Sequence, residues 1–250
     1  MQAYWTLVKR ELGTQFFSWT GYVTMAVATF LLGTSFSSML QSTNRLAMEL
    51  PLTELFYKTY YFWLILLLAT PLITMRTFAW EKATGTFEAL MTTPVSDLQV
   101  VLAKFTGALL FYLLTWLPLL GCLWMVQRYS DGQEALEFGQ LCSTYLGILV
   151  LGAFYLSIGC FASSLTRSQV VAAISALAAG LAIFMVCLMT LHHGLRAGWQ
   201  GRVLAHVSLV DHMRDFARGV IDTRALVFCL SFTWLFLFLT LRSIESRRWR

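Results

Sequence analysis

Six long apolar runs without a charged side chain constrain this 250-residue chain more than any other feature. A helix needs about 20 apolar residues to cross the hydrocarbon core of a bilayer, with about 17 as the lower limit. The runs lie within or at Ser18–Leu40, Thr59–Met75, Phe105–Gln127, Phe138–Thr166, Ser168–Leu195 and Ala225–Leu241. Only 12% of the residues are charged, against about 25% in soluble domains. We therefore predict an all-α polytopic membrane protein, with six transmembrane helices in one domain over residues 1–250.

Residues 1–19 carry an amphipathic pattern. The basic pair Lys9 and Arg10 falls on one side of a helix, and apolar side chains recur on the other. These apolar residues are Trp5, Val8, Leu12, Phe16 and Trp19. Tryptophans opposite basic residues are typical of helices that lie in the membrane interface. We expect such a helix over Tyr4–Trp19, and its central charges argue against a cleavable signal peptide.

The longest mixed polar and apolar segment between two predicted spans is Phe78–Asp97. Gly85 and Pro94 bracket a short helical window in it, Thr86–Thr93, with apolar residues at i, i+3 and i+4. This apolar ridge consists of Phe87, Leu90 and Met91. A short helix with an apolar ridge at a membrane face is suited to docking a partner. An ordinary interfacial loop explains the periodicity equally well.

A second amphipathic stretch, Gly194–Arg224, precedes the last apolar run. It is too charged to span a membrane, yet its apolar residues follow helical spacing. They are Val203, Val207, Val210, Met213, Ala217 and Val220. Between them lie Asp211, Arg214, Asp215 and Arg218, which solvated ion pairing explains without catalysis. We expect an interfacial or re-entrant helix pair buried against the bundle.

The distribution of basic residues predicts the topology, because short cytoplasmic loops are enriched in Lys and Arg while long translocated segments count little. With six spans, both termini lie on one side. The basic residues on that side are Lys9, Arg10, Arg76, Lys82, Lys104, Arg167, Arg242, Arg247, Arg248 and Arg250. Outside the long Arg196–Arg224 segment, those on the other side are Arg45, Lys58 and Arg128. Both termini and Phe78–Asp97 are therefore predicted to be cytoplasmic.

Two of the runs are rich in small residues, which permit close approach of helices in lipid. In the fourth run these are Gly147, Gly152 and Gly159. In the fifth they are Ala172, Ala173, Ser175, Ala176, Ala178, Ala179, Gly180 and Ala182. We expect both helices to lie inside the assembly. Pro71 is expected to kink the second span, and Pro118 lies inside the third.

The sequence carries little that indicates catalysis. It has no G-x-x-x-x-G-K-[ST] loop for nucleotide hydrolysis, no H-E-x-x-H and no G-x-S-x-G. The histidines near the last span are interpreted as interfacial residues rather than metal ligands: His192, His193, His206 and His212. The cysteines all lie in apolar runs and are interpreted as buried free thiols: Cys122, Cys142, Cys160, Cys187 and Cys229. We see no compact basic and aromatic patch for nucleic acid.

No charged residue lies inside a predicted span, which argues against an ion or proton path. This favours a lipid-like or polymeric substrate, or mechanical transmission driven from outside the chain.

The Phe78–Asp97 segment resembles a known motif, F-A-E-E-K-x-x-G-T-x-E-L-L-x-T-x-P-V-S-D followed by G-K. The matching residues are Phe78, Glu81, Lys82, Gly85, Thr86, Glu88, Leu90, Thr92, Pro94, Val95, Ser96, Asp97 and Lys104. The motif is that of ABC-2-type transporter permeases. Pro71, the stretch Thr74–Arg76 and the stretch Phe216–Asp222 resemble the branch associated with gliding motility and nitrous-oxide-reductase maturation. The sequence departs from the motif at Trp80, where the family usually has an acid, and at Ala103, where it has glycine.

The resemblance implies an interfacial N-terminal helix, a cytoplasmic coupling helix after span two, and external re-entrant helices before span six. It implies a bacterial inner-membrane protein that pairs as a homodimer or with a second permease and is driven by a separate ATPase subunit. ATP and Mg²⁺ would bind that subunit, and this chain would need no cofactor. The implied coupling residues are Glu81, Lys82, Gly85, Thr86, Phe87, Glu88, Leu90, Met91 and Pro94. The residues singled out in the external segment are Asp211, Arg214, Phe216, Arg218, Gly219 and Asp222.

Two rival functions stay open beside a permease. One is a mechanotransmission subunit that moves no substrate and couples ATPase cycles to an external partner, such as an auxiliary membrane subunit with a large external domain. The other is an intramembrane enzyme, which the missing motifs disfavour. The permease hypothesis makes the chain a non-enzymatic subunit that contacts membrane lipid and its partner proteins.

Overall fold

The structure is a computed structural model that describes residues 2–43, 52–87, 95–129, 138–192 and 208–248. Within these ranges the chain is helical and contains no strand. The helices are α1 (Gln2–Phe16), α2 (Trp19–Thr43), α3 (Leu52–Lys58), α4 (Tyr60–Thr74), α5 (Ala79–Thr84), α7 (Asp97–Thr115), α8 (Leu117–Tyr129), α9 (Phe138–Leu165), α10 (Gln169–His192), α12 (Leu209–Ala217) and α13 (Thr223–Arg248).

Six stretches are long and apolar enough to cross a membrane, which confirms the predicted number of spans. They are Trp19–Gln41, Tyr60–Thr84, Asp97–Met125, Phe138–Leu165, Gln169–Met189 and Thr223–Ser246. The third differs from a single straight span, because α7 ends at Thr115 and α8 begins at Leu117. Pro118 lies just inside α8 and lacks the N–H that a continuous helix needs. Pro71, in contrast, lies within the unbroken α4.

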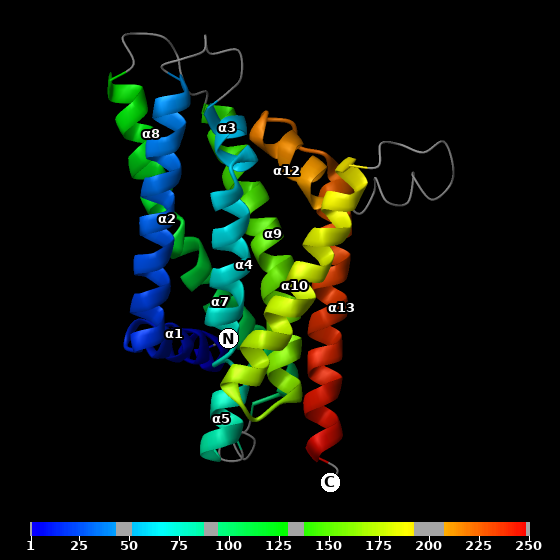
Figure 1. Cartoon of the computed structure of the whole chain (residues 1–250). Coiled ribbons are helices and arrows are strands. Elements are labelled where there is room, and N and C mark those ends of the chain that lie inside the picture. Colours follow the sequence, from blue (N-terminus) through cyan, green and yellow to red (C-terminus); the bar gives the residue numbers. More distant parts are fainter. Residues whose placement is uncertain (1, 44–51, 88–94, 130–137, 193–207, 249–250) are drawn as a thin grey trace, which may run out of the picture.

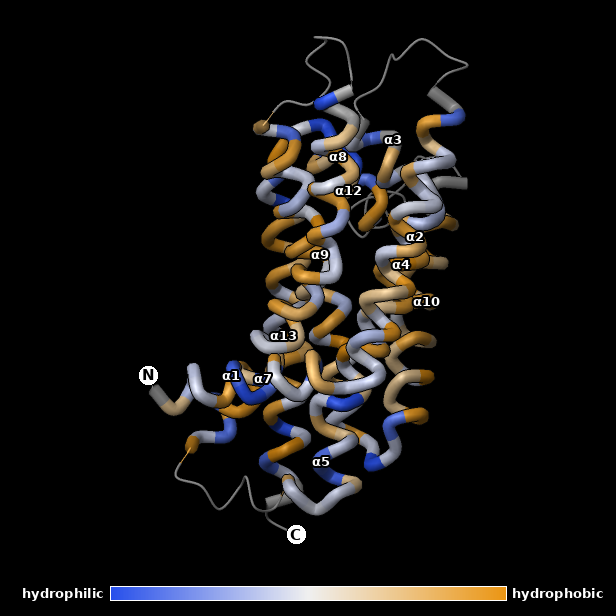
Figure 2. Tube along the Cα trace, turned by 90° about the vertical axis from the view of Figure 1, so that its left-hand side faces the viewer, coloured by the Kyte–Doolittle hydropathy of each residue, from blue (hydrophilic) through white to orange (hydrophobic). Residues whose placement is uncertain are grey.

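Both ends of the chain lie towards one end of the bundle, which we call the proximal end, together with α5 (Figure 1). There α1 runs across the direction of the spanning helices. The opposite, distal end carries α3 and α12. Figure 2 shows hydrophobic residues along the spans and strongly hydrophilic residues towards the two ends. This pattern fits a bundle whose middle lies in hydrocarbon.

Helix α9 is the centre of the bundle, as its glycines predict. In its most apolar stretch 83% of the residues are buried. A Cβ at Gly152 would lie 2.1 Å from Tyr112 of α7, and one at Gly159 would lie 2.1 Å from the Thr74 hydroxyl of α4. The two glycines therefore let α4 and α7 approach α9 more closely than any other residue would.

Helix α10 is largely exposed in the single chain, since only 22% of its most apolar stretch is buried. Its predicted place inside an assembly of several chains stays a prediction. Its small residues do pack inward: Ala172 and Ala176 are buried, and Gly180 faces Tyr155 and Leu67. The other side of α10 carries exposed Ile174, Met185 and Met189. Small residues mark only the packed side of this helix.

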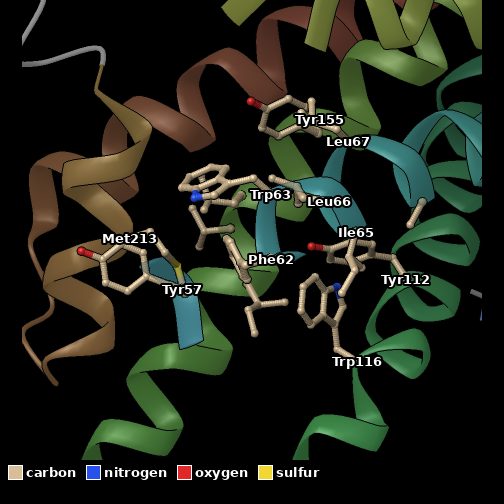
Figure 3. Packing of buried hydrophobic residues seen from close by; sticks show 14 of the residues in the cluster. Tyr57, Phe62, Trp63, Ile65, Leu66, Leu67, Tyr112, Trp116, Tyr155 and Met213 are labelled. Carbon is tan, nitrogen blue, oxygen red and sulfur yellow. The ribbon is translucent and has the colours of Figure 1, made fainter. Parts of the chain in front are cut away.

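The distal half of the core is built from large aromatic and aliphatic side chains (Figure 3). Trp116 is fully buried at the break between α7 and α8, and its ring centroid lies 5.3 Å from that of Phe62. The Tyr145 hydroxyl donates a hydrogen bond to the Trp116 carbonyl, 3.1 Å away. The break is thereby stabilised by aromatic packing and by a side chain of α9.

Candidate functional site

Helix α5 opens the segment predicted to couple with a partner, and Ser163 of α9 fixes its start. The Ser163 hydroxyl accepts hydrogen bonds from the backbone N–H groups of Phe78 and Ala79, at 3.2 and 3.0 Å. The first N–H groups of a helix have no partner within it, so a side chain from another helix satisfies them here. Gly85 ends α5 with a φ of 74°, a left-handed conformation that favours glycine.

Lys82 and Phe87 hold the other side of this segment against the bundle. The Lys82 ammonium donates to the carbonyl oxygen of Ser164 and lies 5.4 Å from the centroid of the Phe87 ring. Phe87 itself is half-buried and packs against a proximal apolar cluster formed by α7, α9, α13 and Phe78. The described part of the segment is thus attached to the central helix and to the proximal apolar cluster.

Four charged side chains, Arg10, Glu11, Glu81 and Lys104, form what we call the proximal network. The Lys104 ammonium lies 2.7 Å from Glu11 Oε1 and 2.9 Å from Glu81 Oε1. Arg10 Nη2 lies 3.0 Å from Glu81 Oε1 and 3.3 Å from Glu11 Oε1. The Lys104 side chain is only 2% exposed. The network therefore joins α1, α5 and α7 through a buried cation.

The packing of α1 on α7 explains how a charged pair can be buried here. Val8, Glu11 and Gln15 are the buried positions of α1, whereas Trp5 stays exposed. A Cβ at Gly107 of α7 would lie 2.8 Å from the Glu11 Cβ, so this glycine lets α1 sit close. The Gln15 amide donates to the Ile73 carbonyl, 3.0 Å away, which ties α1 to α4 as well.

Sequence reasoning missed this network. The apolar run of the third predicted span begins at Phe105, directly after Lys104, but α7 begins at Asp97 and places Lys104 within a membrane-length stretch. The expectation that charges stay outside the spanning helices is therefore wrong for Lys104, which two carboxylates neutralise. The signal was available on α1, where Val8, Glu11 and Gln15 recur at helical spacing and put one acid on an inward face.

The predicted coupling residues fall into three groups. Glu81, Lys82 and Phe87 make contacts within the chain, as described. Gly85 and Thr86 are exposed, together with Trp80, Ala83 and Thr84. Glu88, Leu90, Met91 and Pro94 lie outside the described residues. Contact of these residues with a partner stays a prediction. Among the described residues, the surface that a partner could contact extends from Ala83 to Thr86 and includes Trp80.

The distal end carries a second polar arrangement, between α12 and the short helix α3, which was not predicted. Arg218 donates to both carboxylate oxygens of Glu54, each at 2.9 Å. Arg214 Nε donates to the Tyr57 hydroxyl, 3.1 Å away, and the Thr53 hydroxyl donates to the Ala217 carbonyl at 2.6 Å. The hydrogen bond to Glu54 raises the pKa of the Arg218 guanidinium above its ordinary value.

This arrangement corrects the view that the charges of the distal segment are simply solvated. Arg214 and Asp211 do form a half-exposed pair, 3.6 Å apart. The Glu54 side chain that pairs with Arg218, however, is only 1% exposed. His212, interpreted as interfacial, is buried, with its ring centroid 6.0 Å from that of Phe228.

The remaining residues singled out in the distal segment shape the end of α12 and the start of α13. Phe216 is buried against Gly147 of α9. Gly219 has a φ of 86°, and the N–H of Val220 bonds back to Asp215, which closes the helix. The Asp222 carboxylate accepts from the Arg224 N–H at 2.8 Å, at the first turn of α13. In the expected apolar stripe, Val210, Met213 and Ala217 are buried, Val220 is exposed, and Val203 and Val207 lie outside the described residues.

Helix α12 does not span the bundle, since it has only nine residues. Among the described residues, no group of three or more His, Cys, Asp or Glu side chains could hold a metal ion. Of the cysteines, Cys160, Cys187 and Cys229 are buried free thiols, Cys122 is half-buried and Cys142 is exposed.

Comparison with models of known protein families identifies a match for most of the chain. The family model described as ABC-2 family transporter protein matches residues 20–197. These residues run from the start of α2 to beyond α10 and include the α5 segment. In a search of curated proteins, none matches the chain.

Proposed function

Because the chain belongs to the ABC-2 family of transporter proteins, we propose that it is the transmembrane permease subunit of an ATP-driven transporter. A separate ATP-binding subunit, which would hold ATP and Mg²⁺, supplies the energy. The chain moves or extrudes a substrate across the bacterial inner membrane. The segment from Phe78 to Asp97 is the coupling element on which the ATP-binding subunit acts.

The observation that carries this proposal is the attachment of α5. Three other helices bind it through polar groups: α9 through Ser163 and Ser164, and α1 and α7 through the proximal network. Helices α1 and α9 are far from α5 in the sequence, so these contacts connect it to distant parts of the chain. A displacement applied to α5 therefore reaches the centre of the bundle directly. The exposed residues from Ala83 to Thr86, with Trp80, are available to the partner.

The topology that we propose places the proximal end in the cytoplasm, as the distribution of basic residues predicts. Both termini then lie on the side of the ATP-binding subunit. A homodimer or a pair with a second permease would cover apolar surface that the single chain leaves exposed, such as the outer side of α10. Membership of the gliding-motility and nitrous-oxide-maturation branch stays a prediction.

The second candidate is a mechanotransmission subunit that acts on an external partner. It is favoured by the way α9 links the two ends of the bundle. Ser163 of α9 holds the start of α5, and Gly147 near its other end receives Phe216 of α12. Movement of α9 would thus be transmitted to α3 and α12 at the distal end, where an auxiliary subunit with a large external domain could bind.

The coupling assignment is tested by removing the predicted ridge. We expect Phe87→Ala and Leu90→Ala to lower co-purification of the ATP-binding subunit, or to separate its hydrolysis from substrate movement. Interface anchors of this kind often contribute about 2 kcal/mol or more. Trp124→Ala, at an exposed position on α8, is the matched control. Normal yield of the complex and normal coupled hydrolysis in both ridge variants would refute the assignment.

The Phe87 result needs one further control, because Phe87 also packs within its own chain. The thermal stability of the isolated permease therefore has to be measured for each variant. Loss of the partner without loss of stability supports coupling. Loss of both in Phe87→Ala, with an unchanged Leu90→Ala, would mean that the ridge only stabilises the bundle.

A further inference from the structure

A cavity of about 530 Å³ lies at the proximal end, between α1, the start of α2 and the α5 region. We infer that it binds the headgroup of a membrane phospholipid that carries a primary ammonium group, of the phosphatidylethanolamine class. The lining combines one arginine, two glutamates, several hydroxyl and amide groups and an aromatic rim. Neither the coupling role nor the family assignment requires such a site.

Arg76 supplies the group that would bind the phosphate. Its Nη1 donates to the Thr20 hydroxyl, 2.9 Å away, and its guanidinium lies 5.2 Å from the centroid of the Trp80 ring. It forms no ion pair with any carboxylate in the part of the chain that the structure describes. A guanidinium has five N–H donors and suits bidentate binding of phosphate. Arg76 is therefore held in place with donors left for a ligand.

Glu81 supplies the group that would bind the ammonium. Its Oε1 already accepts from Lys104 and Arg10. Glu81 lines the cavity, and its Oε2 has no hydrogen-bond partner among the described residues. Because this oxygen has almost no accessible surface, the carboxylate has to turn towards the cavity before an ammonium can bind it. A buried acceptor without a partner is unfavourable, and a carboxylate forms its strongest hydrogen bonds with charged donors. A primary ammonium provides both the charge and the N–H donors, which a quaternary ammonium or a glycerol headgroup does not.

The position of the cavity favours a membrane lipid over a soluble ligand. One membrane-length stretch begins at Trp19 and another begins at Gln169, and both residues line the cavity, which therefore lies at an end of these two spans. Phe17 and Trp19 line it and are 90% and 87% exposed. Aromatic side chains at this depth belong to the membrane interface. Acyl chains could therefore pass over the rim while the headgroup enters the cavity.

The test is lipid retention by the purified full-length chain, measured by native mass spectrometry. The protein is exposed to equal amounts of phosphatidylethanolamine, phosphatidylglycerol and phosphatidylcholine with identical acyl chains. We expect one phosphatidylethanolamine to be retained in preference to the other two. Arg76→Gln should reduce this retention about tenfold, the effect of losing one charged hydrogen-bonding group. Arg242→Gln, an exposed arginine on α13 outside the cavity, should leave it unchanged.

Thr20→Val is a second variant for the case that Arg76→Gln does not fold. It removes only the hydroxyl that orients the guanidinium and should give a smaller decrease in the same direction. Equal retention of the three lipids, or a preference for phosphatidylcholine or phosphatidylglycerol, would overturn the ammonium assignment. Unchanged retention in the cavity variants would overturn the site. Displacement of the lipid by millimolar soluble phosphoethanolamine would show a site for a soluble zwitterion, and we expect none.

Discussion

Replacing Lys104 by methionine removes the central cation of the proximal network and keeps a side chain of similar length. Two carboxylates, Glu11 and Glu81, then face each other without the ammonium that lies 2.7 and 2.9 Å from them. Arg10 can still reach both, but its side chain is 45% exposed and water screens it. The substitution therefore leaves two largely buried acids with one half-exposed partner.

The expected loss follows from this geometry. Removing one partner of a buried ion pair costs about 3–5 kcal/mol. Because Arg10 compensates in part, we expect Lys104→Met to lower the free energy of unfolding by about 3 kcal/mol, the lower end of that range. Glu11→Gln leaves Lys104 paired with Glu81 and should cost about 1–2 kcal/mol. The double variant combines Lys104→Met with Glu11→Gln, so it leaves no carboxylate at position 11 without its cation.

A double-mutant cycle measures the interaction itself. Reversible unfolding in mixed micelles, followed by tryptophan fluorescence, gives the stability of the wild type, the two single variants and the double variant. We expect a coupling energy between Glu11 and Lys104 of about 1–3 kcal/mol, typical of residues in direct contact. The double variant should therefore be more stable than the sum of the single losses predicts.

Two results would contradict this interpretation of the proximal network. Additive losses would mean that the two side chains do not interact in the folded protein. A Lys104→Met variant as stable as the wild type would mean that the ammonium is not buried between carboxylates. Either result would remove the electrostatic connection between α1, α5 and α7 on which the proposed transmission depends.

Three further predictions concern packing and topology. Gly152→Ala should destabilise the bundle by about 1–3 kcal/mol, the usual cost of overpacking. Gly33→Ala is the control and should not destabilise it, because nothing lies within 4 Å of the added Cβ. Equal melting temperatures of the two variants would contradict the packing of α9. Arg218→Ala should lower the melting temperature, because it leaves the buried Glu54 carboxylate of α3 without its bidentate partner. An unchanged melting temperature would argue against the docking of α12 on α3. Reporter fusions at Arg250 and Asp131 should report opposite sides of the membrane, and a common side would refute the six-span topology.

The helices were predictable because the signals that define them are local. A membrane-length apolar run needs no knowledge of the rest of the chain, and all six were identified. The glycines of α9 also predicted its central position correctly, since a glycine repeat in lipid has few uses other than close packing. The alanines of α10 are informative about the single chain only in part. They mark one packed side but carry no information about the opposite side, where Ile174 and Met189 are exposed.

The polar contacts were not predictable, because they join residues far apart in the sequence. Lys104 and Glu11 are separated by 93 positions, and Arg218 and Glu54 by 164. Each charge, taken alone, looks like an ordinary residue at the end of a span. The seven-residue helix α3 was missed as well, since so short a helix is stabilised by tertiary contacts rather than by its own sequence.

The central claim is that α5 and its neighbouring turn receive the ATP-binding subunit. The most direct test is a photo-crosslinking amino acid at Trp80, which is exposed on α5, with the same amino acid at exposed Trp124 on α8 as the control. In membranes that contain the ATP-binding subunit, we expect a crosslinked product from position 80 and none from position 124. Absence of the product at position 80, or equal yield at both positions, would contradict the coupling role of this segment.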